Sequence, residues 1–116
     1  HTLVLQGNDV DQRGMDALGH FLSMEETSAL RVLDLHEAKV TDHGRNQDGL
    51  RLFCIGLQKN TTLTDLCLAN NDIRAQGAEH IGEALKINKA LTDLKCSPTS
   101  DPRARFLPLR NVLALL

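Results

Sequence analysis

The sequence predicts an α/β fold in which strand–helix units stack into a curved solenoid, with a parallel sheet on the concave face. The first observation is composition: 21 of the 116 residues are Leu, while the chain has three Phe and no Trp or Tyr. A core filled almost wholly with Leu indicates one packing position used repeatedly. The second is spacing, because the leucines at positions 3, 33, 66 and 94 lie 30, 33 and 28 residues apart.

The clearest unit spans residues 63–88. Its first half reads LxxLxLxxNxI, in which alternating leucines such as Leu66 and Leu68 predict a short strand with one inward face. Its second half carries Ile81 and Leu85 at helical spacing. Neither element closes a core alone, so copies must stack to bury both apolar faces.

Other copies follow the same order of strand and helix. They begin part-way at Leu3, at Leu30 and again at Leu91, where the pattern soon fades. A glycine near each predicted helix start lets the helix approach the strand layer closely, at Gly14, Gly49 and Gly77.

The LxxLxLxxN blocks and the glycine nine residues after the last strand leucine resemble the leucine-rich repeat family. The resemblance covers roughly residues 1–96 and is to the long subclass of ribonuclease inhibitor, NOD-like receptors and Ran GTPase-activating proteins. It implies that the Asn of each block hydrogen-bonds loop backbone inside the stack. Asn8 and Asn71 fit this role, whereas Ala38 and Thr99 do not, so we expect gaps in the second and fourth units.

Residues 97–116 depart from the repeat and form a second region beside residues 1–96. They open with a proline-containing polar loop and end in an apolar stretch. We expect a terminal helix that covers the end of the stack or a degenerate last repeat; the start of further repeats and a non-native segment are the alternatives.

Outward strand positions are the natural binding residues, because they project from a rigid sheet without a packing role. They form a loosely acidic column that suits a partner protein of basic character, although an ordinary solvated face is the alternative. The candidate residues on this face are Asp34, His36, Glu37, Asp65, Cys67, Asn70, Asp93 and Lys95.

A second candidate surface is an insertion of about five residues in the second unit, within residues 41–48. Insertions in a solenoid emerge as loops, often on the binding face. The alternative is a tolerated surface bulge, since lengthening a loop costs little. The binding candidates here are Asp42, His43 and Arg45.

No pattern of catalytic or cofactor-binding residues stands out. His36, Glu37 and His43 lack the i,i+4 histidines of zinc peptidases, and the chain has neither GxSxG nor a phosphate-binding glycine loop. The formal charge of −2 gives no charge-driven affinity for nucleic acid or anionic membrane, and no run is apolar enough to span a bilayer. We therefore expect no enzyme activity, cofactor, metal, nucleic acid or membrane partner.

Cys54, Cys67 and Cys96 are odd in number and widely spaced, which favours free thiols in the cytoplasm over a disulfide framework. Because a cytoplasmic protein is not N-glycosylated, we interpret the acceptor pattern Asn60-Thr61-Thr62 as a coincidence.

The sequence thus predicts a protein-binding scaffold without catalysis, cut from a longer protein. A regulator of a small GTPase and a structural spacer are the alternatives, the first resting on the family resemblance alone. Because uncapped solenoid ends expose leucines and a strand edge, we also expect the isolated chain to self-associate end to end, or to be stable only beside the rest of its parent or a partner.

Overall fold

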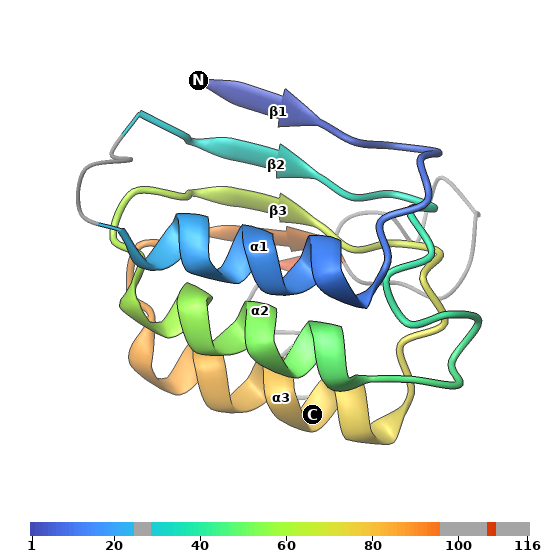
Figure 1. Cartoon of the computed structure of the whole chain (residues 1–116). Helices are drawn as coiled ribbons and strands as arrows, with labels where there is room; N and C mark the ends of the chain where they lie inside the picture. The colour runs from blue at the N-terminus through green and yellow to red at the C-terminus, as the bar shows by residue number, and fades with distance from the viewer. Residues whose placement is uncertain (25–28, 96–106, 109–116) are drawn as a thin grey trace.

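The structure is a computed structural model that describes residues 1–24, 29–95 and 107–108. Strands and helices alternate as β1 (Thr2–Val4), α1 (Gln12–Ser23), β2 (Val32–Asp34), α2 (Asp48–Lys59), β3 (Asp65–Cys67), α3 (Ala75–Ile87) and β4 (Asp93–Lys95), with β5 at Leu107–Pro108. Strands β1 to β4 form a parallel sheet in chain order, and α1 to α3 lie side by side along one face of it (Figure 1). The predicted α/β solenoid is confirmed.

The repeat spacing read from the sequence is also the register of the sheet. Leu3 pairs with Leu33, Leu33 with Leu66, and Leu66 with Leu94. Below, β1 with α1 is called unit 1, β2 with α2 unit 2, and β3 with α3 unit 3. Because side chains alternate along a strand, this row of leucines faces the helices while the residues on either side face outward.

Each helix buries one stripe against that row. Met15 and Leu22 of α1, Phe53 and Leu57 of α2, and Ile81 of α3 are all at most 1% exposed. The start of α1 is fixed by Asp11, whose Oδ1 accepts a hydrogen bond from the Gly14 N–H at 2.8 Å.

The asparagine of the repeat performs the expected role in unit 3. Asn71 is buried; its Nδ2 donates to the Leu35 carbonyl at 2.7 Å, and its Oδ1 accepts from the Ala38 N–H at 2.9 Å. Ala38 has no side-chain amide, so the ladder is interrupted in unit 2 as predicted, whereas Thr99 lies outside the described residues. Asn8 departs from the prediction, because it is exposed and donates only to carbonyls of its own turn.

A second ladder, not predicted from the sequence, joins the carboxyl ends of the helices. Asn60 Nδ2 donates to the Leu22 carbonyl at 3.1 Å, and Asn88 Nδ2 donates to the Leu57 carbonyl at 2.7 Å. The Asn60 side chain is therefore buried and hydrogen-bonded in the folded chain, where it is not presented to a glycosyltransferase.

The insertion of unit 2 lies between β2 and α2, and it is only partly a surface loop. Asp42, His43 and Arg45 are exposed, as expected for loop residues. Thr41 and Gln47 are buried instead, and Thr41 Oγ1 donates to the Asn71 carbonyl at 2.5 Å. The segment folds back over unit 3, which explains the burial of these polar side chains.

The C-terminal region meets the sheet through β5. Leu107 pairs with Leu94 and Pro108 with Asp93, in an antiparallel sense opposite to the repeat strands. The remainder of residues 97–116, including the expected helix or degenerate repeat, lies outside the described residues together with Cys96.

Candidate protein-binding face

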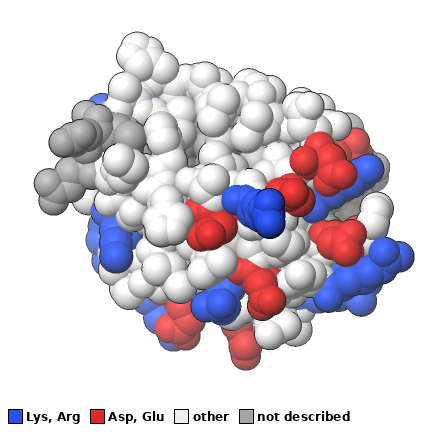
Figure 2. Space-filling model, viewed as in Figure 1, with Lys and Arg blue, Asp and Glu red and all other residues white. Residues whose placement is uncertain are grey.

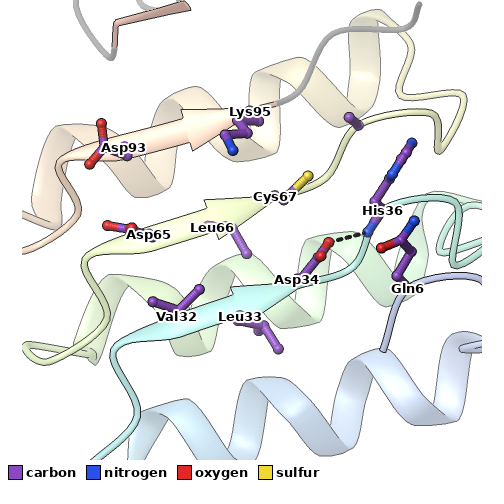
Figure 3. A pocket seen from close by; sticks show the side chains of 11 residues that line it. Gln6, Val32, Leu33, Asp34, His36, Asp65, Leu66, Cys67, Asp93 and Lys95 are labelled. Atoms are coloured by element: carbon purple, nitrogen blue, oxygen red, sulfur yellow. Dashed lines mark hydrogen bonds between the residues drawn. The ribbon is translucent and has the colours of Figure 1, made fainter. Parts of the chain in front are cut away.

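The sheet face opposite the helices contains a hollow of about 360 Å³ (Figure 3). Outward strand positions supply its walls, as expected from the period of two. Six of the eight predicted residues of this face line the hollow: Asp34, His36, Asp65, Cys67, Asp93 and Lys95. Gln6 and Val32 also line it at equivalent outward positions, and that equivalence was the signal by which they could have been included. The remaining lining residues are Leu33, Leu66 and Ala69.

The parallel register arranges the outward residues of β2, β3 and β4 in two rows. Val32, Asp65 and Asp93 stand side by side on β2, β3 and β4. The second row lies two residues further along each strand, nearer the carboxyl ends, and consists of Asp34, Cys67 and Lys95. Neighbouring strands lie about 4.8 Å apart, so residues within a row are close neighbours.

Asp65 and Asp93 are consequently like charges held side by side. Neither forms an ion pair with any residue in the described ranges. The third carboxylate, Asp34, is held by a backbone hydrogen bond: its Oδ1 accepts from the His36 N–H at 3.0 Å (Figure 3). The hollow thus holds three carboxylates and one lysine.

The half-buried Cys67 is not an activated thiol. Burial raises its pKa; the N–H of Ala69 opposes that rise, the Asp34 carboxylate adds to it, and Lys95 opposes it. Because the thiolate is the nucleophilic form, a raised pKa keeps this sulfur unreactive at neutral pH.

The two predicted residues that do not line the hollow are linked to it through His36. Asn70 Nδ2 lies 3.0 Å from His36 Nε2 and donates to Glu37 Oε1 at 3.3 Å. This contact places the Asn70 amide between the His36 ring and the Glu37 carboxylate. Glu37 holds a left-handed backbone, with φ of 50°.

The insertion residues Asp42, His43 and Arg45 do not line this hollow. Within residues 1–24, 29–95 and 107–108, no group of three or more His, Cys, Asp or Glu side chains is placed to hold a metal ion. In that same part of the chain, every helix is too short or too polar to cross a membrane.

A stack of strand–helix units with an open concave sheet defines the class of α/β repeat proteins. A family model described as Leucine Rich repeat matches residues 59–82. Leucine-rich repeat-containing protein 45 of Gallus gallus is 38% identical over 85 residues, an alignment that covers 69% of this chain and 13% of that protein. The chain thus matches only a small part of the length of that relative, and it belongs to the leucine-rich repeat family.

Proposed function

We propose that this chain is a protein-interaction module whose concave face binds a polypeptide segment carrying Lys or Arg side chains. The observation that carries the proposal is the pair Asp65 and Asp93, which face one hollow with Asp34 and form no ion pair among the described residues. Like charges directly opposite on neighbouring strands are unfavourable. A cationic side chain placed between these carboxylates would convert that repulsion into attraction.

The same proposal includes the absence of catalysis; the raised pKa of Cys67, the one thiol that lines the hollow, supports it by disfavouring thiolate chemistry there. It also includes the ribonuclease-inhibitor-like subclass, supported by the full helices that follow β1, β2 and β3. Placement in the cytoplasm is supported by the free thiols of Cys54 and Cys67. Placement within a longer protein is supported by the alignment with the chicken relative, which covers 13% of that protein.

The test is selection of ligands from a displayed library of random peptides. We expect the selected peptides to be enriched in Lys and Arg, and their affinity to fall as the salt concentration rises. Asp65→Asn combined with Asp93→Asn should weaken binding about tenfold or more.

The matched control is Glu79→Gln combined with Glu83→Gln, which removes two negative charges from the exposed side of α3. This control should leave the affinity within about twofold, a difference of less than 1 kcal/mol. Equal losses in both double variants, or selected peptides without basic residues, would show that the concave face is an ordinary solvated surface.

A further inference from the structure

The outer end of unit 1 presents a second surface, distinct from the concave face. A hollow of about 510 Å³ opens between β1 and α1 and is lined mainly by apolar side chains. In the space-filling view the upper region over β1 carries almost no charge, and charged side chains gather lower, over the helices (Figure 2). The acidic residues that line the hollow are Asp9 and Asp11, and the rest of its lining is mainly apolar. A largely apolar surface at the end of a stack marks an interface.

Residue equivalence shows what kind of interface this is. The residues of this end that belong to the core pattern are only partly buried: Leu3, Leu5, Val10 and Leu18. Their equivalents in unit 2 are 0% exposed because unit 1 covers them: Leu33, Leu35, Val40 and Phe53. The outer surface of unit 1 is therefore equivalent to the surface through which unit 2 packs on unit 1. Among the described residues, no further unit covers this surface of unit 1.

The helix layer supports this equivalence. Gly49 at the start of α2 packs against Gln12 and Met15 of α1. Gly14 holds the same place on α1, where it lines the outer hollow instead.

The polar groups of this end complete the comparison. Asn71 uses its Oδ1 to accept from two N–H groups of the preceding unit, those of Ala38 and Val40. The equivalent Asn8 donates to its own turn, and its Oδ1 accepts no hydrogen bond from any described residue. Leu5 N–H bonds to Asp34 on β2, so strand alternation directs the backbone polar groups of Val4 to the outer edge.

We propose that the outer end of unit 1 is a docking surface for one further leucine-rich repeat unit, with its strand parallel to β1. Such a unit brings a helix to cover Leu18, a strand edge to pair with Val4 and two loop N–H groups for Asn8. The proposal involves none of the eight concave-face residues and is independent of the proposed function.

A second copy of this chain meets these requirements poorly. The outer edge of β4 is already paired with β5, so no parallel strand edge is open there. Two copies related by a twofold axis would bring their β1 strands together antiparallel, which places Asn8 away from the loop N–H groups that it needs.

The test joins a copy of residues 64–91 directly before His1 of the full chain. The copied Leu66 then precedes Leu3 by 28 residues, the spacing that separates Leu66 from Leu94. We expect one cooperative thermal transition with its midpoint raised by about 5 °C or more. The amide hydrogen of Val4 should exchange more slowly in the extended chain, because it gains a strand partner.

Two variants make the test specific. Leu18→Glu should abolish the rise in midpoint, and Asn8→Ala should reduce it while leaving the 116-residue chain nearly unchanged, because Asn8 is exposed. The control Ile55→Glu changes an exposed apolar residue of α2 that does not line this hollow and should preserve the rise.

Two separate transitions, or a rise that survives both Leu18→Glu and Asn8→Ala, would overturn the proposal. Light scattering of the 116-residue chain gives a further check. A dimer that Leu18→Glu converts to a monomer would identify a second copy as the occupant instead.

Discussion

The backbone carbonyl of Gly19 in α1 lies directly against the Cα of Gly56 in α2. A Cβ atom at position 56 would collide with the carbonyl group of Gly19, and one at position 19 would lie 2.7 Å from the Leu52 carbonyl oxygen. The first two helices therefore meet backbone to backbone, and only glycine allows that approach. This contact sets the distance between unit 1 and unit 2 on the helix side.

Gly56→Ala is expected to cost about 3 kcal/mol of unfolding free energy, because rigid backbone atoms must separate to admit one methyl group. Urea denaturation measures the change. The matched control is Gly14→Ala, also within a helix, where the nearest atom to a new Cβ is a side-chain methyl of Val10 at 2.9 Å. That control should be nearly neutral, since alanine favours the helix. Similar losses at both sites would contradict the backbone contact.

Leu68→Ala should destabilise the whole chain by about 2–5 kcal/mol, the range for fully buried leucines. Leu68 is 1% exposed and lies in the same hydrophobic core as Leu66, two residues further along the chain. Because each unit depends on its neighbours, the loss should appear as a lower midpoint of one thermal transition. Val4→Ala is the control, since Val4 is 57% exposed and should change the midpoint little. An unchanged melting temperature in Leu68→Ala would show that the register is wrong.

Gln12 and Gln47 occupy equivalent places, each two residues before the glycine of its repeat, but they differ in hydrogen bonding. Gln12 is the first residue of α1, and Gln47 immediately precedes α2. Gln12 accepts from the Gly49 N–H and donates to the Val40 carbonyl at 3.3 Å. Gln47 is buried, and neither polar atom of its side chain bonds to a residue in the described ranges. Gln47→Leu should therefore raise the unfolding free energy by about 1 kcal/mol, whereas Gln12→Leu should lower it by a similar amount. Opposite signs in the two denaturation curves are the expected result; two losses would mean that Gln47 is satisfied in solution.

The sequence predicted the repeat because the relevant information is local and periodic. Leu33 and Leu66 pair as their spacing requires, and the outward positions between them form the concave hollow. Burial of Thr41 was not predictable in this way. It arises because the insertion folds over Asn71 of the next unit, a contact specific to one unit that no repeat pattern encodes. The site was predicted for the same local reason, and Glu37 lies outside its hollow because a left-handed turn redirects the chain there.

Alkaline pH should destabilise the chain through Cys54. Burial raises the pKa of its thiol from 9.0 to about 12, so the unfolded chain loses this proton at lower pH than the folded chain. Stability is therefore full below pH 9 and is lost progressively as pH rises toward 12. Between pH 9 and pH 10 the loss from this one group is about 1 kcal/mol. Denaturation of Cys54→Ala across this range should show a shallower pH dependence, and an unchanged slope would exclude Cys54 as the cause.

Glu37 occupies a backbone conformation that its side chain disfavours. Its φ is 50°, and the equivalent positions of units 1 and 3 hold Gly7 and Asn70, residue types that adopt the left-handed region more readily. Glu37→Gly should therefore stabilise the chain by about 1 kcal/mol, measured as a higher urea midpoint. It also removes the Oε1 atom that accepts from Asn70, so binding of basic peptides to the concave face should weaken. Lys39→Gly, at φ of 56°, is the control that relieves similar strain without removing a carboxylate. Stabilisation by both variants, with weaker binding only in Glu37→Gly, is the expected outcome; unchanged peptide affinity in Glu37→Gly would remove Glu37 from the binding face.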